Sequence, residues 1–127
     1  LQCEASLKLG AITGESRVFE YEKCAAYHLI DLASKEYPVS ASLSHRYIKL
    51  REFDSANQTD YCSLLKAYLR NERNTTHTAR DLFLHRNTII YRVQKIQELL
   101  KCDLDDFDTR MELQHSFFIQ EYLDAIK

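Results

Sequence analysis

The stretch from Thr78 to Leu100, TARDLFLHRNTIIYRVQKIQELL, contains neither Gly nor Pro, and its apolar positions change phase once, around Leu84 and His85. Helical periodicity on both sides of this point predicts two helices, a short one that runs to Phe83 and a longer one over 86–101. In the short helix, Ala79, Leu82 and Phe83 are expected to point inward. The apolar face of the longer segment, which is expected in the core, consists of Ile89, Val93, Ile96 and Leu100. The opposite face is polar and is expected in solvent.

Ala79 is the small residue that a helix-turn-helix needs where its two helices cross. When two helices meet near a right angle through a turn of three or four residues, only a small side chain permits their close approach. The spacing from Ala79 to Ile89 and Val93 fits this arrangement, with the branched residues on the second helix. The first turn of that helix, residues 86–88, is then expected to face outward.

The outward residue types suit recognition of double-stranded DNA. Arg and Asn make bidentate contacts with guanine and adenine edges in the major groove, and Thr offers a hydroxyl and a methyl group. The positive end of the helix dipole at this turn favours phosphates. The residues expected to read bases are Arg86, Asn87 and Thr88, and those expected to contact backbone phosphates are Thr76, His77, Arg92 and Lys95. Tyr91 is either a phosphate hydrogen-bonder or a surface aromatic, and an ordinary solvated face explains the helical wheel equally well.

Charge is distributed unevenly along the chain. The whole chain has a formal net charge of −2. The segment from Arg70 to Lys101 has seven basic and three acidic residues, a net charge of +4, so the remainder carries −6. A basic island in an otherwise acidic chain indicates an anionic partner for that island alone.

The composition predicts an all-α fold. Of 127 residues, 45 % are hydrophobic and 28 % are charged, as in an ordinary globular domain, but there are only two Gly and one Pro. Tight β-turns and phosphate-binding loops need Gly, so a β-rich fold or a nucleotide-binding loop is disfavoured. We therefore expect a small helical bundle that contains a helix-turn-helix, with at most one short strand near the N-terminus, at residues 17–23.

Helices are also expected over residues 24–35, 40–54, 61–71 and 109–126. The expected N-caps are Asp60 for the third helix, Thr76 for the short helix before the turn, and Asp105 or Asp106 for the last. The opening of the chain, 1–11, reads as the end of a helix. We expect three parts: a remnant of a preceding domain or a linker (1–16), a helical connecting segment (17–57) and a helix-turn-helix DNA-binding domain (58–127).

Neither an enzyme nor a metal site is expected. The four cysteines lie far apart without a CxxC pair, which favours reduced thiols over a zinc site or a disulfide framework. The five histidines are scattered, and none has a second His four residues away, as a zinc-binding helix requires. His85, at the turn, is not a preferred helix cap and is expected to contact a phosphate or form the turn. No cofactor is expected.

Three segments carry a family resemblance: LREFDSANQTDYCSLLKAYLRNERN (50–74), TARDLFLHRNTIIYRVQKIQELL (78–100) and DLDDFDTRMEL (103–113). They resemble the C-terminal helix-turn-helix domain of PucR/CdaR-type bacterial transcription regulators, and HRNTIIYR is the most specific part. The resemblance covers 43–123 well. The second segment is also similar to the Fis-type helix-turn-helix, which implies base contacts by Arg86, Asn87, Thr88 and Tyr91.

The chain departs from the family pattern at several positions. NERN, residues 71–74, stands where the family usually has a Gly-containing turn, so Arg73 or a neighbouring Asn is expected in the left-handed backbone conformation. Ile90 replaces a residue that is often basic, which removes an expected electrostatic contact.

The resemblance implies the DNA-binding C-terminal domain of a cytoplasmic bacterial transcription regulator that reads the major groove with the helix starting at Arg86. We expect a homodimer in the full-length protein, because such modules pair to read two half-sites. A small-molecule effector, if there is one, is expected to bind an N-terminal region outside this sequence, and no membrane is involved. The alternative is a protein–protein interaction or dimerisation module without direct DNA binding.

Overall fold

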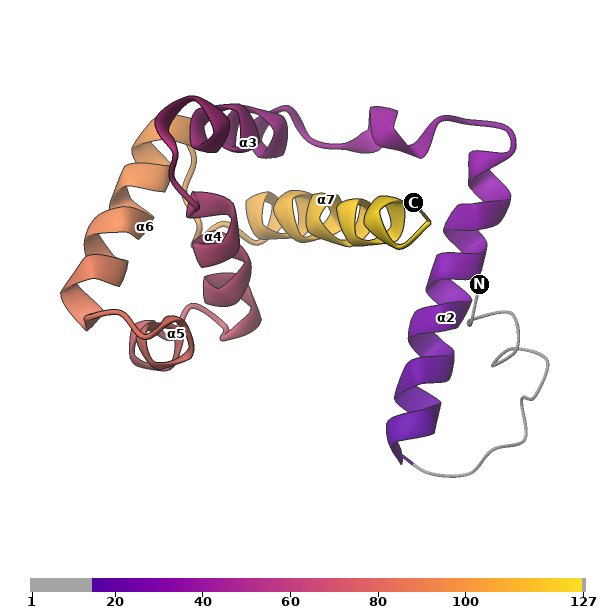
Figure 1. The fold of residues 1–127 in the computed structure, drawn as a ribbon, viewed down its shortest axis with the longest axis horizontal. Coiled ribbons are helices and arrows are strands. Elements are labelled where there is room, and N and C mark those ends of the chain that lie inside the picture. The colour runs from indigo at the N-terminus through magenta and orange to yellow at the C-terminus, as the bar shows by residue number, and fades with distance from the viewer. Residues whose placement is uncertain (1–14, 127) are drawn as a thin grey trace. The chain divides into compact units, whose positions relative to one another are not determined.

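The computed structural model describes the backbone of residues 15–126 and the side chains of residues 22–126. This range is all-helical, with six α-helices, one 3-10 helix and no strand (Figure 1). In chain order the elements are α2 (Glu15–Ser34), η1 (Val39–Ser42), α3 (His45–Asn57), α4 (Tyr61–Arg70), α5 (Thr75–Leu82), α6 (Arg86–Leu100) and α7 (Phe107–Ala125). The expected all-α class is therefore confirmed. The helix end expected at residues 1–11 lies outside the described residues. No helix in the described range combines the length and apolar character that crossing a membrane requires.

The strand expected at residues 17–23 is wrong, because these residues lie within α2. The segment has no Gly or Pro, and its Glu and Lys residues are poor strand formers but good helix formers. The helix expected over 40–54 starts later, at His45, where the Ser44 side chain accepts a hydrogen bond from the Tyr47 N–H group. The residues before it form the short helix η1 instead.

The chain divides into two compact units, 43–118 and a second unit that joins 1–42 to 119–127. Among the described residues of the second unit, α2 packs against the end of α7. The rings of Tyr27 and Tyr122 meet edge to face with their centroids 5.9 Å apart. The Tyr122 side chain is buried, and its hydroxyl donates a 3.0 Å hydrogen bond to the Asp31 carboxylate.

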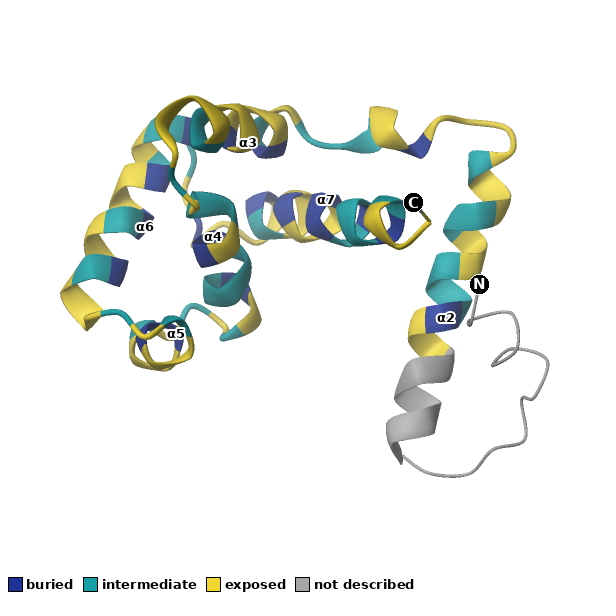
Figure 2. Ribbon diagram, viewed as in Figure 1, coloured by how far each residue is buried: buried dark blue, intermediate teal, exposed yellow. Residues whose placement is uncertain are grey.

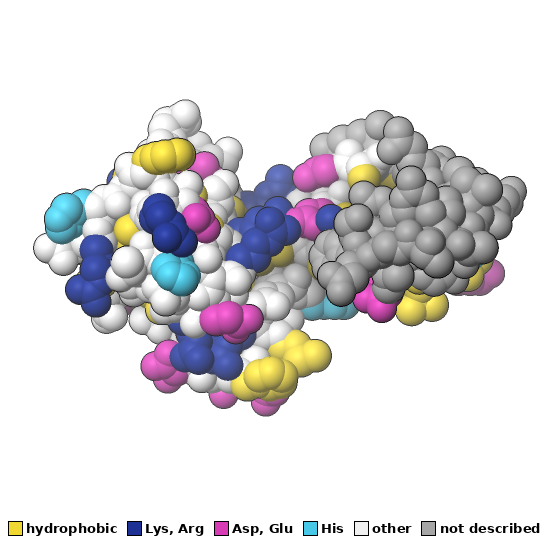
Figure 3. Space-filling model, turned by 90° about the horizontal axis from the view of Figure 1, so that it is seen from below, with side chains coloured by type: hydrophobic (Ala, Val, Ile, Leu, Met, Phe, Trp, Pro, Cys, Tyr) yellow, Lys and Arg dark blue, Asp and Glu magenta, His cyan; other side chains and the backbone are white. Residues whose placement is uncertain are grey.

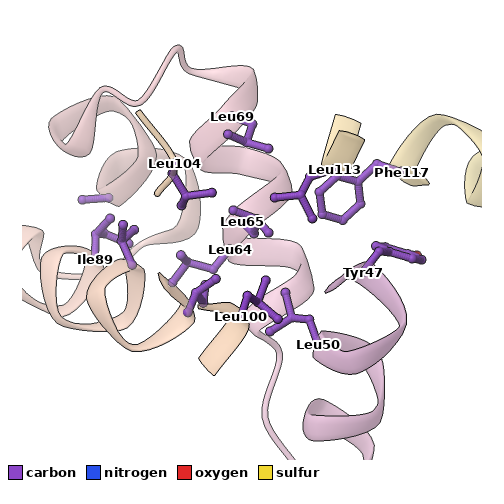
Figure 4. Close-up of a cluster of buried hydrophobic side chains, with 13 residues drawn as sticks. Tyr47, Leu50, Leu64, Leu65, Leu69, Ile89, Leu100, Leu104, Leu113 and Phe117 are labelled. Carbon is purple, nitrogen blue, oxygen red and sulfur yellow. The ribbon is translucent and has the colours of Figure 1, made fainter. Parts of the chain in front are cut away.

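The unit 43–118 has a single apolar core to which α3, α4, α5, α6 and α7 all contribute (Figures 2 and 4). The fully buried aliphatic side chains at its centre are Leu50, Leu64, Leu65, Ile89, Ile96, Leu104 and Leu113. Burial of each such side chain contributes roughly 1.5–3 kcal/mol relative to exposure. The core therefore holds α6 along its length, which leaves its other face to solvent.

Helices α3, α5 and α6 each end at a left-handed residue that is not Gly, and two such residues follow the end of α4. The residues with positive φ are Gln58, Glu72, Arg73, Phe83 and Lys101. Both Gly residues of the chain come before residue 15, so none is available at these turns. The expectation that Arg73 takes the left-handed conformation is confirmed, and Glu72 shares it. At the end of α5 the Leu84 N–H group donates to the Ala79 carbonyl over 2.9 Å, which stops the helix in a Schellman-type turn.

Asp54 connects α3 to the start of α4. Its carboxylate accepts hydrogen bonds from the Thr59 hydroxyl at 2.6 Å and from the N–H groups of Tyr61 and Cys62, each at 2.8 Å. These two N–H groups lie in the first turn of α4, where no carbonyl of the helix can accept from them. Asp60, the expected N-cap of α4, accepts from Ser63, so this expectation is confirmed.

Asp54 is expected to make the stability of the fold depend on acid pH. Burial would raise the pKa of its carboxyl, but the hydrogen bonds from Thr59, Cys62 and Tyr61 outweigh burial and lower it below the ordinary value of 3.8. Such a group stabilises the fold fully above its unfolded pKa, and that contribution is lost as pH falls through the lower, folded pKa. At neutral pH we expect the unaltered chain to have a larger free energy of unfolding than the Asp54→Asn variant. This difference in free energy, the stability gap, should narrow as the pH falls. Urea titrations of both proteins from about pH 6 to about pH 3 measure this gap, and a gap independent of pH would contradict the assignment.

The cysteines follow the sequence-based expectation only in part. The thiols of Cys62 and Cys102 are free, as expected. Cys24, by contrast, is disulfide-bonded, so the expectation of four reduced thiols is wrong. Spacing along the chain does not limit which cysteines meet in space. Burial, followed by the nearby Asp54 carboxylate, raises the pKa of the Cys62 thiol to about 12, which keeps it in the unreactive, protonated form.

Candidate nucleic-acid interface

Helices α5 and α6 form a helix-turn-helix. They are joined by Phe83, Leu84 and His85, and Figure 1 shows that α5 lies across the lower end of α6 and does not continue it. Ala79 of α5 is 7 % exposed and belongs to the same core cluster as Ile89 of α6, which is 0 % exposed. The small residue and the branched residue therefore lie in the core, as the sequence predicted.

The start of α5 differs from expectation at its cap. Asn74 is the N-cap, because its side-chain oxygen accepts a 2.9 Å hydrogen bond from the His77 N–H group. The prediction of Thr76 as the cap is wrong. Thr76 lies inside the first turn and, like His77, is exposed. Asn is a slightly better cap than Thr, and Asn74 already has the extended backbone that the cap position requires.

The start of α6 is capped by His85. Its Nδ1 atom accepts a 3.0 Å hydrogen bond from the Asn87 N–H group, and its backbone is extended. The expectation that His85 would not cap a helix is therefore wrong. The sequence signal was weak, since His is not among the preferred N-cap residues. The cap fixes where α6 begins, so that Arg86 and Asn87 occupy its first, exposed turn.

The structure leaves the eight predicted DNA-binding residues at the surface of these two helices. Six are exposed, namely Thr76, His77, Arg86, Asn87, Tyr91 and Lys95. Two are half-buried, namely Thr88 and Arg92. Thr76 and His77 lie at the start of α5, and the other six lie on α6, between Arg86 and Lys95. Their roles stay predictions.

The surface around the helix-turn-helix carries accessible positive charge. Figure 3 shows the molecule from below the view of Figure 1, the side on which α5 lies, and Lys, Arg and His side chains recur there with Asp and Glu side chains between them. Arg73 is engaged elsewhere, since its guanidinium contacts the Asp105 carboxylate at 2.7 Å. Arg86, Arg92 and Lys95 form no ion pair with other described residues, so their charges are available to an anionic partner.

Two exposed apolar side chains accompany these polar ones. Phe83, in the turn, is 95 % exposed, and Ile90, on α6, is 46 % exposed. Phe83 is the end of the short helix, as expected, but the expectation that it points inward with Ala79 and Leu82 is wrong, because it takes the left-handed conformation of the turn and stays in solvent. The described residues contain no group of three or more His, Cys, Asp or Glu side chains suited to a metal ion.

Comparisons with known proteins agree with this geometry. Residues 61–117 match the model of the PucR C-terminal helix-turn-helix domain. The chain is 31 % identical over 109 residues to the proline-responsive transcriptional activator PutR of Bacillus subtilis, a match over 84 % of this chain and 26 % of PutR. It is 39 % identical over 59 residues to the purine catabolism regulatory protein of the same bacterium, over 46 % of this chain and 11 % of that protein.

A third relative is the carbohydrate diacid regulator of Escherichia coli, which is 30 % identical over 107 residues, a match over 84 % of this chain and 27 % of that regulator. The chain thus spans about a quarter or less of the length of these relatives. No solved structure matches it significantly. The family match and the named regulators support a DNA-binding, regulatory role.

Proposed function

We propose, from the premise that residues 61–117 are a PucR-type C-terminal helix-turn-helix domain, that this chain is the DNA-binding part of a bacterial transcription regulator. The observation that carries the proposal is the exposed first turn of α6, with Arg86 and Asn87, on a helix whose opposite face is buried in the core. A helix held in this way can enter the major groove with its N-terminal turn leading.

Each predicted residue has a distinct task in this proposal. Arg86 and Asn87 make bidentate hydrogen bonds to guanine and adenine edges, and Thr88 offers its hydroxyl and methyl groups to the neighbouring bases. The residues that contact phosphates are Thr76, His77, Arg92, Lys95 and, through its hydroxyl, Tyr91. Contacts to phosphates set affinity and register but carry little sequence information.

The context of the domain is part of the same proposal. In the full-length protein the domain works as a homodimer, because paired helix-turn-helix units read two half-sites about one helical turn apart. PutR is named as proline-responsive, and by analogy a small molecule would control this protein through a region outside this chain. The protein acts in the cytoplasm, where the DNA is. The division of the chain at residues 16 and 57 stays a prediction.

Selection of bound sequences from random double-stranded DNA tests the proposal. The chain is immobilised, fused to a dimerisation module so that two copies can bind together, and the bound DNA is sequenced over successive rounds. We expect enrichment of a sequence with two related half-sites. Without enrichment, the alternative of a protein–protein interaction module would replace the proposal.

The salt dependence of binding separates DNA binding from apolar docking. The logarithm of the association constant should fall linearly with the logarithm of the salt concentration, with a slope of roughly −0.9 for each phosphate neutralised. Arg92→Ala and Lys95→Ala should each make this slope shallower by about one, and should weaken binding to all sequences alike. Fluorescence anisotropy over a range of salt concentrations measures the slope.

Lys49→Ala is the matched control for these two variants. Lys49 is an exposed lysine of α3, outside the basic island. Its replacement should leave the slope unchanged. If all three variants change the slope equally, the positive charge of the whole surface matters and the assigned phosphate contacts are wrong.

A further inference from the structure

Ile90 is an aliphatic residue on the polar face of α6. Its side chain is 46 % exposed, whereas those of Ile89, Val93 and Ile96 on the same helix are buried. It follows Arg86 by four residues and Asn87 by three, and these spacings bring side chains together on one helical surface. Ile90 thus extends the surface that the first turn of α6 presents.

The folded chain gains little from this side chain where it lies. Half of its surface stays in water, and a β-branched residue is a slightly poorer helix former than Lys, Arg or Gln at an exposed position. The neighbouring exposed side chains on this face, Asn87, Tyr91 and Gln94, can all make hydrogen bonds, and Ile90 cannot. On this face of α6, Ile90 is therefore the side chain that would gain from contact with an apolar partner.

The major groove offers one such partner among the bases. Thymine alone carries a methyl group there, at C5, and apolar side chains contact it. Residues three apart on a helix differ by about 4.5 Å along its axis, which is close to the roughly 3.4 Å between successive bases of one strand. A side chain three residues after Asn87 therefore reaches a base pair adjacent to the one that Asn87 contacts.

We propose that Ile90 is a specificity-determining residue that packs against the C5-methyl group of a thymine next to the base pair read by Asn87. The proposal rests on the proposed function, and adds to it a preference for thymine at one position of each half-site. A cytosine there would lose the methyl contact.

Replacing thymine by uracil tests the proposal, because this change removes only the methyl group. In the selected DNA sequence, each thymine is replaced in turn, and the dissociation constant is measured for the chain and for Ile90→Ala. At one position per half-site, uracil should weaken binding of the unaltered chain about fourfold. This is the change in affinity expected when burial of one group the size of a methylene is lost. The same replacement should leave the affinity of Ile90→Ala unchanged.

Ile48→Ala is the matched control, since Ile48 is an exposed isoleucine of α3 outside the helix-turn-helix, and this variant should keep the full sensitivity to uracil. Circular dichroism should show the same helical content for all three proteins. If a sequence is selected but no uracil replacement distinguishes the chain from Ile90→Ala, the role of Ile90 is wrong and the proposed function stands. If no sequence is selected, the proposed function fails and the role of Ile90 fails with it.

Discussion

Arg86→Ala and Asn87→Ala are each expected to remove sequence-specific DNA binding while the helical content stays the same. Both side chains are exposed in the first turn of α6 and contribute nothing to the core. A bidentate contact to a base contributes about 1–3 kcal/mol of discrimination, so affinity for the selected sequence should fall by roughly five- to 150-fold. Affinity for unrelated DNA should change much less, because phosphate contacts supply it.

Gel-shift titrations on the selected sequence and on a scrambled one measure both effects. Asn87→Ala keeps the backbone N–H group that the His85 side chain accepts from, so the cap of α6 is preserved. Lys49→Ala again provides the control, since Lys49 lies on α3. An unaltered gel shift with either Arg86→Ala or Asn87→Ala would refute the base-reading role of that residue.

Ala79→Leu is expected to destabilise the fold by about 1–3 kcal/mol, because three extra carbon atoms enter a packed core. Ala79 is buried in the cluster that also contains Ile89 and Val93 of α6. A leucine at this position separates α5 from α6 or displaces the residues around it. Because α5 positions the first turn of α6, specific DNA affinity should fall together with stability.

Arg80→Leu introduces the same side chain at the next position of α5, which is exposed. Surface substitutions of this kind usually change stability by less than about 0.5 kcal/mol. Urea denaturation of the two variants and of the unaltered chain compares them directly. Equal stability of Ala79→Leu and Arg80→Leu would mean that close approach of the two helices does not depend on a small residue at 79.

The periodic parts of the fold could be predicted from the sequence. The buried face of α6, with Ile89, Val93, Ile96 and Leu100, was predicted from the helical spacing of apolar residues, which burial in a core enforces. Asp60 was predicted as one cap, and Asp105 or Asp106 as another, because a carboxylate at this position accepts from the free N–H groups of the first turn. Asp106 accepts at 2.9 Å from the Thr109 N–H group.

Other features depend on geometry that residue type alone does not determine. Thr76 was the expected cap of α5, but the helix begins earlier, with Asn74 as its cap directly after the left-handed turn at 72–73. Asp54 lies six residues before the expected cap of α4, yet the ends of α3 and α4 approach so closely that it also binds the first turn. Neither the disulfide of Cys24 nor the exposure of Phe83 has a local sequence signal.

The cap at the start of α6 also fixes the tautomer of His85. Because Nδ1 uses its lone pair to accept from the Asn87 N–H group, the proton of the neutral imidazole resides on Nε2. The ring then offers a single N–H donor directed away from the helix it caps. An uncharged group with one oriented proton can bind a phosphate oxygen without the counter-ion release that Arg and Lys contacts entail. In the proposed complex with DNA, such a contact from His85 would add geometric selectivity without adding to the ionic-strength dependence of binding.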